Sequence, residues 1–368
     1  MKSMPGQEQS ALICSVIDSE KVLWRDVRQA PFMLHGFYHP QSEPYFHRMP
    51  EETAATVSTE VLQLQRQSTG GRVRFSTDSP YIAIRAKYRF VERDTRGMPL
   101  VATAGFDLYE DGPFGNLFIR GSNICIDDND CYEQLLRLMR SGLRTYTINF
   151  PILSEIQTLE IGLAPQAKLE APRPYRAFLP VVFYGSSITH GKAASRPGLI
   201  YEAEISRMLN IDYINLGFSG FALAEQAMAR YIGSLPMSVF VCDYDHNSPS
   251  SKYLNETHWP MYETFRAAQP DTPYIMITRP NYYTAEDASG EVMARRDVVM
   301  RSYLRAREAG DKNVYFIDCT AFFADEQLYS CTQDPVHPSE IGFMHMAKVI
   351  GTVLRRILEE RSADGMVE

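Results

Sequence analysis

After Pro180, short apolar runs alternate with longer stretches in which apolar residues recur at helical spacing. The apolar runs read PVVFYG, DYINLG, MSVFVCDYD, PYIMITRP and NVYFID. Runs without polar interruption indicate strands that are covered on both faces, and such strands belong to parallel sheets whose connections are helices. This pattern predicts a parallel α/β domain with helices on both faces, which we place at residues 178–368.

The first 170 residues follow a different pattern, in which apolar and polar residues alternate over short runs such as RVRF, YIAIRAKY and YTINF. A period of two with Gly, Asp and Pro at the breaks predicts antiparallel strands, so we expect a β-sandwich domain at residues 1–170. Within it, only DCYEQLLRLMRSG, residues 130–142, shows a helical pattern, and we predict a helix there. The following connector contains Pro172, Pro174 and Pro180, which lack the N–H group that a central strand requires. The domain boundary therefore falls in this connector.

Charge and hydropathy limit the partners that the chain can bind. The 368 residues carry a formal net charge of −8, with acidic and basic residues mixed along the chain, so no basic face is offered to nucleic acid or to an anionic membrane. No apolar run approaches the ~18 residues that a membrane span needs. Pro5, Gln7 and Glu8 interrupt the N-terminus, and we expect no signal peptide. These features predict a cytoplasmic protein that binds neither nucleic acid nor membrane.

Parallel α/β sheets bind ligands beyond the carboxyl ends of their strands, so the residues directly after each apolar run are the candidates for chemistry. Three such segments and a fourth before the last predicted helix are rich in polar residues and glycine: Gly185 to Thr189, Asn215 to Gly220, Asp243 to Asn247, and Asp334 to His337. Together they contain a hydroxyl, an imidazole, a carboxylate and several N–H donors. These are the groups that a serine hydrolase needs.

Ser187 is the expected nucleophile because it follows the first strand where the chain turns toward a helix. A serine hydroxyl needs a base, and His337 is the candidate because imidazole titrates near neutral pH. Asp334 would orient that imidazole, although an aspartate before a helix can also serve only to stabilise the helix N-terminus. The expected oxyanion hole consists of the backbone N–H groups of Ser187 and Gly217 and the side-chain amide of Asn247. The alternative for Asn247 is a loop residue that bonds to its own backbone.

These segments resemble the sequence blocks of the GDSL, or SGNH, hydrolases. The segment GSSIT around Ser187 looks like the first block, NLG ending at Gly217 resembles the glycine block, DYDHN ending at Asn247 stands at the asparagine block, and Asp334-x-x-His337 matches the last block. In the N-terminal part, AGFDLYEDG is similar to the Gly-x-Asp-Leu-Tyr signature of a β-sandwich domain that precedes the hydrolase domain in one branch of this superfamily. Two departures exist: a serine replaces the usual aspartate before the nucleophile, and a serine follows the asparagine of DYDHN.

The resemblance implies a flavodoxin-like α/β/α hydrolase domain after a jelly-roll-like β-sandwich. It further implies ester hydrolysis through an acyl-serine, with neither a metal nor an organic cofactor, and with O-acetyl groups on carbohydrates as the commonest substrate. An esterase or acyltransferase of small-molecule products is the alternative within this branch, and a catalytically silent glycan-binding protein is the alternative outside enzymology. An α/β-hydrolase fits less well, because its nucleophile motif G-x-S-x-G requires glycine where this chain has Thr189.

Residues for substrate binding are harder to identify. Trp259 and Tyr282 could stack on a sugar ring, although buried aromatic residues are commoner, and Arg196 either shapes the pocket or forms a surface ion pair. His246 beside Asp243 and Asp245 could suggest a metal, but no spacing there matches a zinc motif. The expected partner is an acylated carbohydrate or another small ester, and a homo-oligomer is compatible with the sequence.

Overall fold

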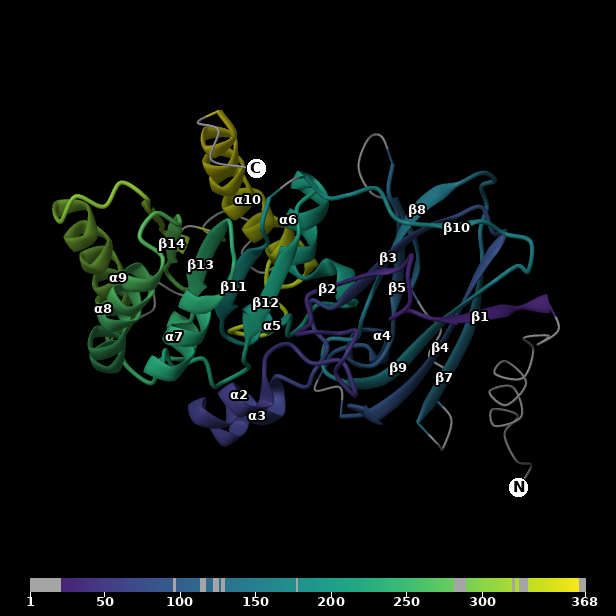
Figure 1. The fold of residues 1–368 in the computed structure, drawn as a ribbon. Coiled ribbons are helices and arrows are strands. Elements are labelled where there is room, and N and C mark those ends of the chain that lie inside the picture. The colour runs from purple at the N-terminus through teal and green to yellow at the C-terminus, as the bar shows by residue number, and fades with distance from the viewer. Residues whose placement is uncertain are drawn as a thin grey trace, which may run out of the picture. The chain divides into compact units, whose positions relative to one another are not determined.

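The computed structural model describes a chain with two compact units (Figure 1). The described residues are 21–94, 97–112, 117–121, 126, 130–176, 178–280, 289–319, 322–323 and 330–363. Unit 1 comprises Met1–His47 and Arg66–Pro174, and unit 2 comprises Arg48–Gln65 and Tyr175–Glu368.

Unit 1 is built from two antiparallel sheets. The first has the order β1-β9-β4-β7, with β1 at Leu23–Asp26, β4 at Tyr81–Phe90, β7 at Cys131–Arg137 and β9 at Glu155–Leu163. The second has the order β10-β3-β8-β5-β6 with β2 paired to β3; the bounds are β2 Met33–His35, β3 Arg72–Thr77, β5 Asp107–Glu110, β6 Leu117–Gly121, β8 Arg144–Asn149 and β10 Leu169–Glu170.

Alternation along the strands of unit 1 explains why the sheets form a sandwich. In β4, Ile84, Ala86 and Tyr88 are buried, whereas Arg85 and Lys87 between them are partly exposed. The buried side chains of both sheets belong to one hydrophobic cluster, as expected when two sheets pack face to face. The predicted β-sandwich is thereby confirmed.

The predicted helix at residues 130–142 is wrong, because this segment forms β7 and pairs with β4. Tyr132 and Leu136 are its buried apolar residues. A spacing of four places two side chains on one face of a helix, but it also places them on one face of a strand, because four is an even number. The apolar pattern therefore fitted both structures. In unit 1 the structure describes one short helix, α4, at Leu100–Thr103.

Unit 2 contains a five-stranded parallel sheet, as predicted. Its order is β12-β11-β13-β14-β15, with β11 at Val181–Gly185, β12 at Tyr213–Gly217, β13 at Val239–Asp243, β14 at Tyr274–Ile277 and β15 at Val314–Ile317. This is the flavodoxin-like strand order.

Helices cover both faces of this sheet (Figure 1). They are α5 at Ser187–His190, α6 at Tyr201–Leu209, α7 at Gln226–Ser234, α8 at Ser251–Ala268, α9 at Glu291–Glu308 and α10 at Glu340–Ala363, with 3-10 turns η2 at Pro197–Leu199 and η3 at Asp245–Asn247. The apolar residues of β11 alternate accordingly: Val182 and Tyr184 join the cluster under α7 and α8, and Phe183 contacts Tyr201 of α6. No helix in the described ranges is long and apolar enough to cross a membrane.

Two helices from the N-terminal part of the sequence belong to unit 2. These are α2, Glu51–Val57, and α3, Thr59–Leu64. Ala54 and Val61 are fully buried in the same hydrophobic cluster as Met228 of α7. The structure thus divides the chain differently from the predicted limits of 1–170 and 178–368, because burial of these apolar side chains joins residues 48–65 to the α/β core.

Candidate active site

The segment after β11 sets the position of Ser187. Gly185 ends the strand, and a Cβ atom there would lie 2.1 Å from the Thr189 Oγ1 atom, so glycine permits α5 to cross close over the strand end. Ser186 is the N-cap of α5, and its Oγ accepts a hydrogen bond from the Ile188 N–H at 3.1 Å. Ser187 is then the first residue of α5, where a backbone N–H has no partner within the helix.

The structure brings Ser187, His337 and Asp334 together. The Ser187 Oγ atom lies 2.9 Å from the His337 Nε2 atom. On the other side of the ring, His337 Nδ1 lies 2.8 Å from Asp334 Oδ2. These distances are those of hydrogen bonds, and the three side chains form the chain of contacts by which a base can activate a serine.

Local hydrogen bonds hold the Asp334 carboxylate in place. Its Oδ1 accepts the backbone N–H groups of Val336 at 2.8 Å and of His337 at 2.7 Å. Partial burial raises the pKa of Asp334, but the bonds from the His337 ring and from these two N–H groups outweigh it, so the pKa lies below its ordinary value. Asp334 is therefore a carboxylate at neutral pH and favours the His337 tautomer with its proton on Nδ1.

The loop that carries His337 is closed at its base. Ser339 N–H donates to Cys331 O at 2.8 Å, and Gln333 N–H donates to His337 O at 3.0 Å. Ser339 also accepts from the Gly342 N–H at 3.4 Å, the capping role expected before α10. The loop is thereby fixed to the helix that follows it.

Gly217 lies at the end of β12, but its N–H group already has a partner. It donates to the Oδ1 atom of Asn215 at 2.9 Å. A Cβ atom at Gly217 would lie 2.2 Å from the His190 N atom, so the close approach of α5 requires glycine here. Three residues later, Gly220 is exposed and has φ +81°, and the space beside its Cα is open.

Asn247 is oriented by a neighbouring loop. Its Oδ1 accepts the Ala222 N–H at 3.2 Å, so the side chain does not simply bond to its own loop. This bond turns the Nδ2 group away from Ala222, and within the described part of the chain no partner of Nδ2 is found.

Beneath α5 lies a buried polar network that the sequence analysis missed. Asn215 Nδ2 donates to Thr189 O at 2.6 Å and to Glu202 Oε1 at 3.2 Å. The Thr189 hydroxyl lies 3.1 Å from Tyr201 OH and 3.4 Å from Asp243 Oδ2. Burial raises the pKa of both Glu202 and Asp243 well above the ordinary carboxyl value. Polar residues within the apolar-spaced helix IYEAEISRML were the signal for this network.

The residues considered for a metal have other partners. Asp245 forms an ion pair with Arg295 at 3.2 Å and accepts the Arg279 N–H at 3.0 Å. His246 Nε2 lies 3.2 Å from the Pro280 O atom, and burial lowers the pKa of His246 to about 3. In the ranges that the structure describes, no three His, Cys, Asp or Glu side chains are grouped as metal ligands.

The predicted substrate-binding residues have separate positions. Trp259 lies on α8, where its ring contacts Tyr262 at 4.9 Å between centroids and the Arg305 guanidinium at 3.9 Å. These contacts are typical of a packed aromatic side chain. Arg196 is half-buried just before η2. Tyr282 lies outside the described residues.

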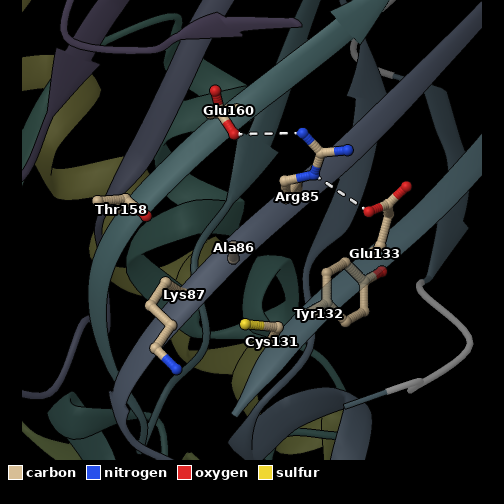
Figure 2. A pocket seen from close by; sticks show the side chains of 8 residues that line it. All are labelled: Arg85, Ala86, Lys87, Cys131, Tyr132, Glu133, Thr158 and Glu160. Carbon is tan, nitrogen blue, oxygen red and sulfur yellow. Dashed lines mark hydrogen bonds and ion pairs between the residues drawn. The ribbon is translucent and has the colours of Figure 1, made fainter. Parts of the chain in front are cut away.

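A separate hollow of about 300 Å³ lies in unit 1, on strands β4, β7 and β9. Figure 2 shows Arg85 between Glu133 and Glu160, to which it is paired at 3.1 Å and 3.6 Å. The Arg85 guanidinium also lies 3.9 Å from the Trp24 ring. Lys87 also lines the hollow, so its two positive charges balance its two negative charges.

Comparisons with known proteins match both parts of the chain. Residues 179–355 match the sequence model of the GDSL-like lipase/acylhydrolase family, and residues 22–169 match the GxDLY model, described as the N-terminus of SGNH-hydrolase-type esterases. Comparison with curated proteins gives no significant match.

The solved structures that share the fold include the following three. A protein from Bacteroides ovatus assigned to the GDSL-like lipases is 26% identical, with a TM-score of 0.81, over 92% of this chain and 98% of its own. The salicylyl-acyltransferase SsfX3 from a tetracycline biosynthetic pathway is 20% identical, with a TM-score of 0.74, over 93% and 98%. A family two carbohydrate esterase from Cellvibrio japonicus is 11% identical, with a TM-score of 0.61, over 92% and 98%.

The two sequence matches follow one another along the chain, and the shared fold extends over both units. Residues 179–355 therefore form a domain of the GDSL-like lipase/acylhydrolase family, and residues 22–169 form the GxDLY domain described at the N-terminus of SGNH-hydrolase-type esterases.

Proposed function

We propose that the protein is a serine esterase that hydrolyses short acyl esters, with O-acetyl groups on carbohydrates as its preferred substrates. The contact chain from Ser187 through His337 to Asp334, at 2.9 Å and 2.8 Å, is the observation that carries this proposal. The family whose model matches residues 179–355 supports ester hydrolysis.

Ser187 is the proposed nucleophile. Its Oγ atom attacks the ester carbonyl carbon while His337 Nε2 takes the hydroxyl proton, and a tetrahedral oxyanion forms. His337 then returns that proton to the leaving alcohol, and the acyl group remains on Ser187. Water, losing its proton to His337, releases the carboxylic acid and restores the serine. Asp334 stabilises the imidazolium in both halves of this cycle.

The proposed oxyanion hole contains the Ser187 N–H and the Asn247 Nδ2 group. Asn247 is suited to this role because Ala222 holds its oxygen and leaves its amino group available. The Gly217 N–H could contribute only as a shared donor, since it is bonded to Asn215. We therefore propose Gly220, exposed in the same loop, as a further donor. Removal of one such donor typically lowers kcat by about 10²- to 10³-fold.

Two features support hydrolysis of small acyl groups on carbohydrates. The Asp334 and His337 side chains are 46% and 17% exposed, so water has access to the base. Ser219 and Gly220, in the loop after β12, are small, which suits an acetyl group better than a long acyl chain. Carbohydrate esterases are among the proteins that share the fold, as is an acyltransferase, and transfer to a small-molecule alcohol is the alternative activity. Arg196 is the proposed contact to substrate outside the acyl site.

The test is the specificity constant kcat/KM across acetyl, butyryl and octanoyl aryl esters and on acetylated xylan and mannan oligomers. A hydrophobic pocket discriminates by about 10- to 200-fold per methylene, so we expect acetyl esters to react fastest and octanoyl esters scarcely at all. Release of acetate from the oligomers at a higher kcat/KM than from aryl acetate would support the carbohydrate substrate. A maximum at six or more acyl carbons, or acyl transfer faster than hydrolysis, would favour the alternative. No turnover of any ester, with binding of glycans, would indicate the catalytically silent protein.

A further inference from the structure

Arg48 is a buried arginine that joins the N-terminal segment of unit 2 to the sheet. It precedes α2 and is only 2% exposed. Its backbone N–H donates to Gln65 O at 2.9 Å, and this hydrogen bond joins the two ends of the segment that contains α2 and α3. Neither the triad nor the proposed oxyanion hole includes this residue.

The Arg48 guanidinium binds three backbone carbonyl groups. Its Nη1 donates to Asn215 O at 3.0 Å and to Gly217 O at 2.8 Å, and its Nη2 donates to Leu64 O at 2.6 Å. Strand β12 is the edge strand of the sheet. Carbonyl groups two residues apart face the same side of a strand, and at an edge they lack a partner strand. Arg48 therefore takes the place of a neighbouring strand at the end of β12.

The guanidinium also lies 4.9 Å from the centre of the Phe218 ring, so it contacts the first residue of the loop that follows β12. Burial lowers the pKa of Arg48 to about 9, with Glu202 acting to raise it, so the side chain stays charged at neutral pH. A planar cation with several donors suits this set of carbonyl groups and a ring, and lysine cannot reproduce it.

The strand end held by Arg48 is connected to the proposed catalytic groups. The Asn215 side chain accepts the Gly217 N–H and donates to Thr189 O in α5, the helix that begins with Ser187. In the following loop, Ala222 N–H holds the Asn247 amide. A shift of the end of β12 would therefore move both the loop and the orientation of Asn247.

We propose that Arg48 is a positioning residue for acyl transfer, which fixes the end of β12 and the loop at residues 218–222 and thereby sets the geometry of the oxyanion donors. This proposal rests on the proposed esterase function. Displacement of catalytic groups by about 1 Å can cost about 10²-fold in rate. Loss of Arg48 should therefore lower the rate of the chemical step more than it weakens substrate binding.

The test compares the wild type with Arg48→Lys and Arg48→Gln, using p-nitrophenyl acetate as substrate and phenylboronic acid as a tetrahedral inhibitor of the active serine. Arg266→Gln is the matched control, because the Arg266 Nη1 group also donates to three carbonyl groups, those of Gln269, Pro270 and Thr272. All rates are expressed per active site, counted by titration of the serine.

We expect both Arg48 variants to lose about 10- to 100-fold in kcat, with KM within about threefold and with weaker boronic acid inhibition by the same factor as kcat. The control should lower Tm and keep kcat within about twofold. Folded Arg48 variants with unchanged kcat and unchanged inhibition would overturn the proposal, and so would failure of both variants to fold, which would show a role in folding alone. A wild type without Ser187-dependent activity would instead overturn the proposed function, and this proposal with it.

Discussion

Ser186 and Ser187 are adjacent, but their hydroxyl groups have different partners. The Ser187 Oγ faces His337 Nε2, whereas the Ser186 Oγ caps α5 by accepting the Ile188 N–H. Ser186 is fully buried, and Ser187 is half-buried. One hydroxyl is thus placed for reaction and the other for stability.

Substitution separates these two roles. We expect Ser187→Ala to lower kcat/KM for an aryl acetate by about 10⁴-fold or more, because no other group can form the acyl intermediate. Ser186→Ala should retain most of the activity and lose about 1 kcal/mol in the free energy of unfolding, since only a helix cap is removed. Hydrolysis rates and urea denaturation of both variants check this. An inactive Ser186→Ala with an active Ser187→Ala would shift the proposed nucleophile by one position.

The acidic residues at the end of β13 and in η3 give a second expectation. Asp245 is bound to Arg295 and Asp243 to Thr189, and the proposed mechanism uses only groups of the protein chain. Prolonged chelation should therefore leave kcat/KM within about twofold of the untreated enzyme. A stoichiometric metal in the purified protein, with loss of activity on its removal, would instead assign these carboxylates and His246 to a metal-dependent mechanism.

The sequence analysis could identify functional residues at the ends of strands, but it could not identify the buried residues that support them. The rule that ligands bind beyond the carboxyl ends of parallel strands led to Ser187, and the polar segment before the last predicted helix led to Asp334 and His337. Glu202 stands out only as a polar residue in a helix with apolar spacing. Arg48 carries no signal, because two of its backbone partners lie 167 and 169 residues away in sequence. Only the folded chain brings those partners together.

Helices α2 and α3 show where domain boundaries cannot be read from a change of pattern. In EETAATVSTEVLQL, Ala54, Val57, Val61 and Leu64 recur at helical spacing, but the sequence analysis assigned a helical pattern in this half only to residues 130–142 and missed both helices. Their assignment to unit 2 could not be predicted, because it depends on packing against α7. The same limit applies to β7, whose apolar spacing fitted a helix as well as a strand.

This packing predicts the result of a truncation. Deletion of all residues before about Arg173 removes α2 and α3, and it exposes the apolar surface of α7 that contains Met228 and Ile232. We expect an aggregated or much less active fragment, since exposed apolar patches of this kind favour association. In the full chain, Val61→Asp should lower the free energy of unfolding because Val61 is buried within unit 2. Gln63→Asp, at an exposed position of α3, should leave it unchanged. A soluble and fully active fragment would show that α2 and α3 are dispensable.

Buried ionisable groups make the stability of the molecule depend on pH. His258 on α8 is 2% exposed, and its ring stacks on the Tyr244 ring with 6.0 Å between the ring centroids. Burial lowers the pKa of His258 from 6.5 to about 4. Between these values the unfolded chain binds a proton that the folded chain does not. The contribution of His258 to the free energy of unfolding is therefore complete above pH 6.5 and decreases as the pH falls toward 4.

The contribution of His258 is measurable by replacing it. Each unit of pH in this window changes the free energy of unfolding by up to about 1.4 kcal/mol per group, so the wild type should lose about 2 kcal/mol from this residue between pH 6.5 and pH 4.5. His258→Phe keeps a flat ring against Tyr244 without a titrating group, and its stability should fall less over the same range. His39→Asn, at an exposed position with φ +37° that asparagine tolerates, is the control and should follow the wild type. Urea denaturation at pH 6.5, 5.5 and 4.5 compares the three proteins, and equal slopes for wild type and His258→Phe would show that His258 accepts its proton in the folded state.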